Sequence, residues 1–117
     1  MTDLRSAQNG RVDEDDVMKG VMDAAGFGGW MSFHVGRSDL GLVQGTSGFP
    51  DVVLVHPGRR RLLVLELKRE DGRYRPGQAE WLEAFRRAGV DARTIRPGDL
   101  EALEDELLGD RLVRVVR

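Results

Sequence analysis

Residues 49–68 read FPDVVLVHPGRRRLLVLELK, and this stretch decides the fold of the 117-residue chain. Two short runs rich in Val and Leu, Pro50–His56 and Arg61–Leu67, flank the turn sequence Pro57-Gly58-Arg59-Arg60, which predicts a β-hairpin. Both runs are apolar at successive positions. That pattern is typical of strands inside a sheet that is covered on both faces.

The symmetry of the turn predicts the register of this hairpin. If the turn is centred on Gly58-Arg59, the numbers of paired residues add up to 117, which places Asp51 opposite Glu66. Lys68 shares a face with Glu66, because side chains alternate along a strand. Two opposed carboxylates repel each other, so a positive charge from Lys68 or from a bound cation must compensate them.

The residue types of this cluster indicate a chemistry. Carboxylate oxygens are the ligands that suit Mg²⁺ or Mn²⁺. A divalent cation beside the ammonium group of Lys68 indicates phosphodiester hydrolysis, because the cation activates a water molecule and neutralises the phosphate. The lysine orients that water or stabilises the developing charge. A purely structural interpretation stays open on spacing alone: Glu66 and Lys68 form a salt bridge, and Asp51 starts a strand after Pro50.

Apolar spacing and the placement of Gly and Pro predict the elements around the hairpin. A flexible tail over residues 1–12 precedes a single α/β domain over residues 13–117, with a central mixed sheet flanked by helices in the order α-β-β-β-α-β, then α-β. The expected elements outside the hairpin are helix Asp13–Ala25, strand Trp30–Val35, loop Gly36–Gly48, the basic loop Arg69–Arg75, helix Pro76–Ala88, strand Val90–Ile95, helix Pro97–Leu108 and strand Leu112–Val116.

Composition excludes several classes of protein. The chain has no cysteine and two histidines, which removes disulfides and most zinc sites. No apolar run approaches the roughly 20 residues of a membrane span, and the polar N-terminus lacks a signal-peptide pattern. The net charge of −2 conceals a segregation, since residues 59–75 carry seven basic and three acidic side chains. We therefore expect a cytoplasmic protein without a membrane partner.

The motif and its surroundings resemble a known family. Gly48-Phe49-Pro50-Asp51, followed after fourteen residues by Glu66-Leu67-Lys68, resembles the PD-(D/E)xK nuclease superfamily. Three further segments narrow the resemblance to the VRR-NUC domain, in its stand-alone form from phages and bacteria, over about residues 13–98: Gln78-Ala79-Glu80-Trp81-Leu82, Ala88-Gly89 and Trp30–Val35.

The resemblance implies a restriction endonuclease-like core and a set of roles. Asp51, Glu66 and the main-chain carbonyl of Leu67 bind Mg²⁺ or Mn²⁺, and Lys68 serves the attacking water and the transition state. Gln78 supports the site from the following helix. The family also carries an acidic residue on the first helix, and Asp16, acting through a water molecule, or alternatively Glu14 occupies that place.

Basic and aromatic residues near the motif are candidate nucleic-acid contacts. They are Arg59, Arg60 and Arg61 at the hairpin tip, Arg69, Arg73, Tyr74 and Arg75 after Lys68, and His34 on the strand before the motif.

The function expected is a divalent-metal-dependent endonuclease acting on DNA. The short chain favours recognition of a junction, flap or nick, resembling Holliday-junction resolvases, and a homodimer. RNA stays open as a substrate. The alternatives are a non-catalytic nucleic-acid-binding or assembly module that has kept the fold, and a sequence-specific restriction-type endonuclease. The expected location is the cytoplasm of a bacterium or of a phage-infected host cell.

Overall fold

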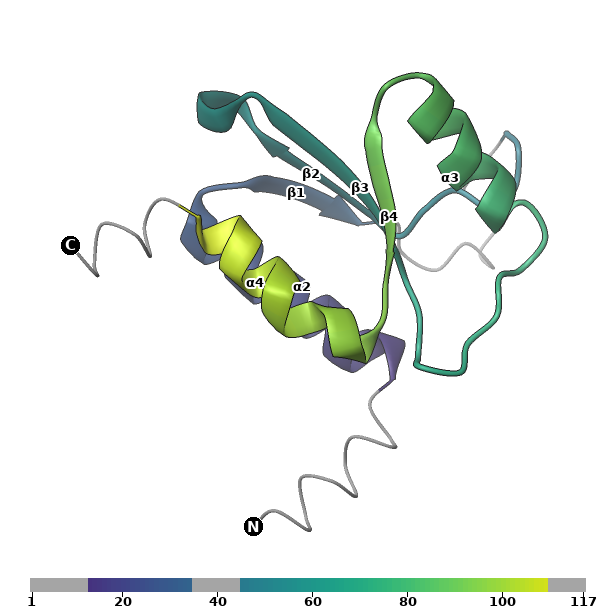
Figure 1. Cartoon of the computed structure of the whole chain (residues 1–117), viewed down its shortest axis with the longest axis horizontal. Coiled ribbons are helices and arrows are strands. Elements are labelled where there is room, and N and C mark those ends of the chain that lie inside the picture. The colour runs from purple at the N-terminus through teal and green to yellow at the C-terminus, as the bar shows by residue number, and fades with distance from the viewer. Residues whose placement is uncertain (1–12, 35–44, 110–117) are drawn as a thin grey trace, which may run out of the picture.

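A four-stranded mixed sheet forms the centre of the fold in the computed structural model, which describes residues 13–34 and 45–109 (Figure 1). Its strands lie in the order β1 (Met31–His34), β2 (Val52–His56), β3 (Arg61–Leu67) and β4 (Asp91–Ile95). β2 is antiparallel to both β1 and β3, whereas β3 and β4 are parallel. The prediction of an α/β fold with a mixed sheet is confirmed.

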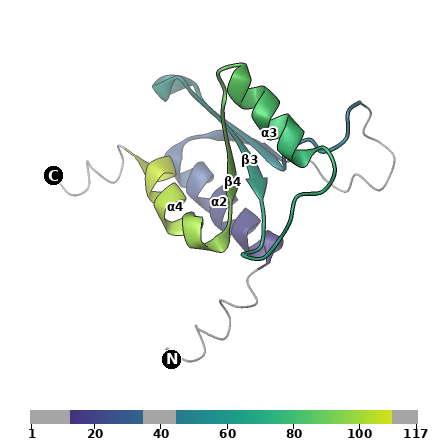
Figure 2. The same cartoon turned by 45° about the vertical axis from the view of Figure 1, so that its right-hand side comes forward.

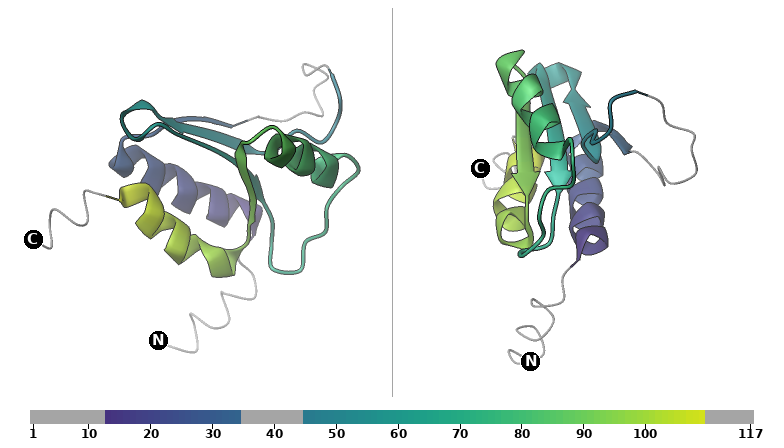
Figure 3. Two further views of the ribbon diagram at one scale, coloured as in Figure 1. Left: turned by 45° about the horizontal axis from the view of Figure 1, so that its top comes forward. Right: turned by 90° about the vertical axis from the view of Figure 1, so that its right-hand side faces the viewer.

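Helices cover the two faces of this sheet unequally. α2 (Glu14–Gly28) and α4 (Leu100–Leu108) lie side by side against one face, and α3 (Gln78–Arg87) lies against the other (Figures 2 and 3). α3 is the crossover that parallel neighbours such as β3 and β4 require. Two 3₁₀ turns complete the described elements, η2 (Pro57–Arg59) in the hairpin and η3 (Pro97–Asp99) before α4.

The larger part of the core lies between the sheet and the α2–α4 pair. Leu65 and Leu67 of β3 pack there against apolar residues of both helices, including Val21 and Leu107. A smaller cluster on the other face joins Val64 to Leu82 of α3. Because β3 contributes to both clusters, its second half is fully buried. Any charged group placed there needs a partner.

Both ends of α2 are defined by local chemistry. Asp13 and Asp16 form a reciprocal capping box at the first turn, and Gly29, with φ of +83°, ends the helix. The helix therefore extends three residues beyond the predicted end at Ala25. Gly28 allows α4 to pack closely against this last turn, because a Cβ at this position would lie 2.0 Å from the carbonyl oxygen of Leu107 in α4.

The prediction that both hairpin strands are covered on two faces is wrong near the turn. Val55 and Leu62 are exposed, since α3 packs over Val64 and not over the hairpin end of the sheet. Other predictions lie outside the described residues: the tail over 1–12, residue 35 of the first strand, residues 36–44 of the glycine-rich loop, and the strand over 112–116. None of the helices in the described ranges is long and apolar enough to cross a membrane.

A charged network fastens α4 to the opposite end of the sheet from the motif. Glu106 of α4 pairs with Arg61 and, through both oxygens, with Arg93, and Arg93 also pairs with Asp91. Hydrogen bonds from Arg93 and Arg61 lower the pKa of Glu106 to about 2. The same kind of contact lowers the pKa of Asp91.

Candidate active site

The hairpin register brings Asp51 to the end of β3. Val53 pairs with Val64 and Val55 with Leu62, so the numbers of paired residues add up to 117 as predicted. Asp51 comes one residue before β2, and its carboxylate accepts a hydrogen bond from the backbone N–H of Leu67 at 2.8 Å. Asp51 is therefore bound to the segment that carries the other two motif residues.

Glu66 and Lys68 form a buried ion pair on the α3 face of the sheet. Their side chains are 1% and 3% exposed, and the Lys68 Nζ lies 3.2 Å from the Glu66 Oε2. The salt bridge of the structural interpretation thus exists. It leaves the other oxygen, Oε1 of Glu66, buried and without a hydrogen-bond partner among the described residues. An unpaired buried carboxylate oxygen is costly, so this atom requires a proton, a water molecule or a bound cation.

The same surroundings change the acidity of Glu66. Burial, together with the negative charge of Asp51, raises the pKa of Glu66 to about 7, while Lys68 works in the opposite direction. Removing the carboxylate from water and placing a second carboxylate beside it both disfavour its ionised form. A bound cation would reverse this balance by favouring the charged form.

These residues fit a divalent cation. The Glu66 oxygen without a partner among the described residues and the Asp51 carboxylate are hard donors. Leu67, which follows Glu66 and binds Asp51 through its backbone N–H, has a main-chain carbonyl of the same donor type. The acidic residues expected on the first helix are not brought into the cluster. Asp16 is exposed and caps α2, and over residues 13–34 and 45–109 no group of three or more Asp, Glu or His side chains is positioned to hold a metal ion. Glu14 likewise joins no such group.

Two glycines hold the motif against the start of α3. Gly48 and Gly77 both have positive φ, and their backbones touch. A Cβ on Gly48 would lie 2.4 Å from the carbonyl carbon of Gly77, and a Cβ on Gly77 would lie 2.3 Å from the carbonyl oxygen of Ser47. Only glycine at both positions permits this approach, which fixes the segment leading into Pro50 and Asp51.

Gln78 acts on the loop that follows Lys68. Its side-chain oxygen accepts a hydrogen bond from the backbone N–H of Arg75 at 2.7 Å. This contact is with the loop and not with Asp51, Glu66 or Lys68, so the supporting role expected for Gln78 stays a prediction. Arg69, Arg73 and Arg75 are exposed along this loop, and Tyr74 forms a hydrogen bond with Thr94 of β4. Thr94 lies opposite Glu66 in the register of β3 and β4, so the loop flanks the carboxylates.

Arg96 is a residue that sequence reasoning missed. One of its guanidinium nitrogens donates to three carbonyl oxygens of the loop, those of Arg69, Glu70 and Gly72, at 2.6, 3.2 and 2.8 Å. Glu70 in turn accepts a hydrogen bond from the backbone N–H of Gly98 at 2.6 Å. The basic loop is thus anchored to the end of β4. An arginine directly after a predicted strand was the only signal in the sequence.

The hairpin arginines are not brought to the carboxylates. They lie at the other end of β2 and β3, about 20 Å along a seven-residue strand. Arg59 donates to the last carbonyls of α4, those of Glu106, Leu107 and Leu108, and Arg61 pairs with Glu106. Arg60 is exposed at the tip. His34 pairs with Val52 and therefore projects from the sheet face opposite to that of Asp51 and Glu66.

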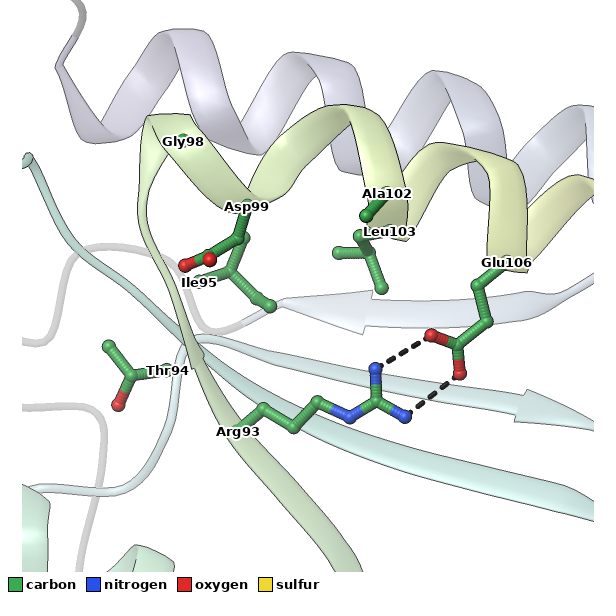
Figure 4. A pocket seen from close by; sticks show the side chains of 8 residues that line it. All are labelled: Arg93, Thr94, Ile95, Gly98, Asp99, Ala102, Leu103 and Glu106. Carbon is green, nitrogen blue, oxygen red and sulfur yellow. Dashed lines mark hydrogen bonds and ion pairs between the residues drawn. The ribbon is translucent and has the colours of Figure 1, made fainter.

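A pocket on the α4 side of β4 is separate from this site (Figure 4). Arg93 and Glu106 form one wall, and their charges are paired with each other. Figure 4 also shows Thr94 on the other side of the β4 ribbon from Leu103 and Glu106. The carboxylates and this pocket thus lie on opposite faces of the sheet.

The fold and the cluster define a class of protein. A mixed sheet flanked by helices, with Asp51, Glu66 and Lys68 at one end of the central hairpin, is the arrangement of the PD-(D/E)xK nucleases. The sequence model of the VRR-NUC domain matches residues 33–97, which is more than half of the chain. The chain belongs to the VRR-NUC domain family, a family of nuclease domains.

Solved structures share this fold. One described as "VRR_NUC domain" superimposes with a TM-score of 0.61 and 22% identity, covering 86% of this chain and 94% of its own. A second, "VRR_NUC domain protein", gives a TM-score of 0.56 and 19% identity over 76% of this chain and 81% of its own. At these identities the likeness concerns the fold. No curated protein matches the chain in sequence.

Proposed function

We propose that the protein is a divalent-cation-dependent endonuclease that hydrolyses phosphodiester bonds in DNA at a junction, flap or nick. The observation that carries this proposal is the buried Glu66 oxygen that has no partner in the described part of the chain, beside Asp51 and the Lys68 ammonium group. The salt bridge with Lys68 engages only Oε2 of Glu66, so it does not satisfy this atom. Family membership supports nuclease chemistry in general.

Each residue of the cluster has a role in this proposal. Asp51, Glu66 and the Leu67 carbonyl would hold Mg²⁺ or Mn²⁺, which supplies charge neutralisation and an activated water when bound. Lys68 is buried, and its ammonium group is held by the ion pair with Glu66. The ammonium protons that do not face Glu66 are available to orient the water or to donate to a phosphate oxygen. Burial of the pair excludes bulk water and strengthens these interactions.

The test is a cleavage assay with purified protein. Branched, flapped, nicked and linear DNA, and single-stranded RNA, are incubated with Mg²⁺, Mn²⁺ or EDTA. We expect cleavage with a divalent cation, none with EDTA, and a preference for one of the discontinuous DNA structures. Asp51→Asn, purified in the same way, must lose the activity, which excludes a contaminating nuclease. Nucleic-acid binding without cleavage would favour the non-catalytic alternative, and preference for one sequence in linear DNA would favour the restriction-type enzyme.

We also propose that the protein acts as a homodimer, with β1 in the interface. β1 has a neighbouring strand on one side only within residues 13–34 and 45–109. Met31 and Phe33 of this strand are 67% and 63% exposed, and the register continues them into the exposed Val55 and Leu62 on the same face. A free strand edge beside an apolar surface supports pairing with a second copy.

Light scattering at increasing protein concentration measures this association. We expect the wild-type protein to have twice the mass of the chain and Phe33→Glu to have the mass of a monomer, because the new charge falls on the apolar surface. Ser32→Glu is the matched control. It adds the same charge to the same strand on the opposite face, and it should leave the dimer intact. A wild-type protein that is monomeric at all concentrations would contradict the proposal.

A further inference from the structure

The loop between β3 and α3 presents one aromatic side chain next to the carboxylates. Tyr74 is 44% exposed, and its hydroxyl forms a hydrogen bond with Thr94. Thr94 pairs with Glu66 in the parallel register, and neighbouring strands lie about 4.8 Å apart, with the side chains of paired residues on the same face. The hydroxyl group of Tyr74 therefore lies at the residue of β4 that neighbours Glu66 of β3.

This loop has a fixed shape without any ligand. Three of its carbonyl oxygens accept hydrogen bonds from Arg96, and the Glu70 carboxylate accepts one from the backbone of Gly98. At its other end, the side chain of Gln78 accepts a hydrogen bond from the backbone of Arg75. A surface that is ordered in advance loses little conformational entropy when a ligand binds.

The charges around Tyr74 suit a nucleic-acid strand. Arg73 and Arg75 flank it in the sequence, and both side chains are exposed and form no ion pair with any residue that the structure describes. The acidic groups of the loop have partners, since Asp71 lies 3.7 Å from Arg69 and Glu70 binds Gly98. An aromatic ring between two available guanidinium groups is the combination that binds single-stranded nucleic acid, with the base on the ring and the phosphates on the cations.

We propose that Tyr74 is a stacking platform for one unpaired base adjacent to the phosphate that is cleaved. The inference rests on the proposed nuclease function and gives a physical reason for a preference for discontinuous substrates. A base stacks on this ring only when it has left its duplex partner, and bases at junctions, flaps and nicks do so at a low cost. The hydroxyl bond to Thr94 fixes the ring, and the exposed part of the ring receives the base.

The test measures binding without cleavage, in EDTA and at low salt. Fluorescence anisotropy compares a single-stranded DNA oligonucleotide with copies in which one base at a time is replaced by an abasic site. Stacking on an aromatic side chain corresponds to about 5- to 150-fold in affinity. We expect removal of the base at one or two adjacent positions to weaken binding of the wild-type protein by such a factor. The same series in RNA shows whether the platform accepts both kinds of strand.

Two variants separate stacking from a role in holding the loop. Tyr74→Phe keeps the ring and loses the bond to Thr94, whereas Tyr74→Leu loses both. If the ring binds a base, the Phe variant retains the abasic effect and the Leu variant loses it. If Tyr74 only holds the loop, the two variants behave alike, which would overturn the proposal.

Two further results would also overturn it: an abasic series that is flat for the wild-type protein, and absence of binding to every oligonucleotide. Cleavage is measured in a separate reaction with Mg²⁺. A protein that binds with the expected abasic effect but does not cleave would therefore contradict the proposed function while the stacking platform stands.

Discussion

Replacing Lys68 by methionine is expected to lower the rate of DNA cleavage by about 10² to 10³-fold, the loss that follows removal of a charge-stabilising donor from an active site. Methionine keeps most of the length and the apolar part of the side chain but has no proton to donate. If Lys68 acts on the transition state, kcat falls and KM changes little, because the group does not contribute to binding of the ground state. Single-turnover cleavage of a nicked duplex in Mg²⁺ measures the effect.

The same substitution also destabilises the fold, so the experiment needs a second variant. At pH 8, where Glu66 is ionised, Lys68→Met leaves its carboxylate buried without its ion-pair partner, and breaking a buried pair costs about 3–5 kcal/mol. The double variant Glu66→Gln/Lys68→Met has no unpaired charge, and we expect its free energy of unfolding in urea to recover most of the loss. Its cleavage should not recover. Cleavage within tenfold of the wild-type rate by folded Lys68→Met would show that Lys68 has no catalytic role.

The arrangement of the motif residues along the hairpin could be predicted from the sequence because its geometry is local. A four-residue connection between His56 and Arg61 fixes the register, and the register fixes which side chains oppose each other. Every observed β2–β3 pair has residue numbers adding up to 117, so the position of Asp51 beside the Glu66 segment follows from counting. The β3 bounds, Arg61–Leu67, also agree with the prediction.

The fate of the hairpin arginines could not be predicted in this way. Arg59 binds carbonyl oxygens that lie 47 to 49 residues later in the chain, and Arg61 binds a carboxylate 45 residues later. The direction in which α4 ends relative to the hairpin depends on packing of the whole α2–α4 layer. In the sequence, Arg59-Arg60-Arg61 resembles a phosphate-binding cluster. Nothing in these three residues indicates that the C-terminus of α4 lies against them.

Parallel pairing explains what was missed near the carboxylates. The sequence predicts a strand over Val90–Ile95. The residues of this segment do not indicate that it pairs with β3, or in which register. Only that register places Thr94 opposite Glu66 and carries Arg96 to the loop after Lys68. The mutual contact of Gly48 and Gly77 is equally non-local, since each glycine is required because of the other.

The second large effect expected concerns Glu66 and the dependence of stability on pH in the absence of cations. The pKa of Glu66 is about 7 in the folded protein, against 4.5 for an unperturbed glutamate. Between these two values the folded state holds a proton that the unfolded state has released, so stability decreases as pH rises. The difference corresponds to about 3 kcal/mol of unfolding free energy lost between pH 4.5 and 7. Urea denaturation in EDTA across this range measures it.

Glu66→Gln removes this contribution, because glutamine does not titrate. The unfolding free energy of the wild-type protein relative to Glu66→Gln should fall as pH rises from 4.5 to 7, and then level off. A difference that stays constant with pH would show that Glu66 titrates normally. Glu106→Gln serves as the control carboxylate. Its pKa of about 2 places its titration below this window, so it should not remove the decrease between pH 4.5 and 7.

Addition of Mg²⁺ connects the same measurement to function. A cation at the free Glu66 oxygen competes with the proton, so it should stabilise the protein strongly at pH 8 and hardly at pH 5. At 100 times the dissociation constant the gain is about 2.7 kcal/mol. Glu66→Gln and Asp51→Asn should lose this gain, whereas Glu106→Gln should keep it. Equal stabilisation at pH 5 and pH 8, or full stabilisation of Glu66→Gln, would place the cation elsewhere. If only Glu66→Gln and Asp51→Asn lose the stabilisation by Mg²⁺, the cation binds where Glu66 holds its proton in the free protein. That position is then the site of the proposed catalytic metal.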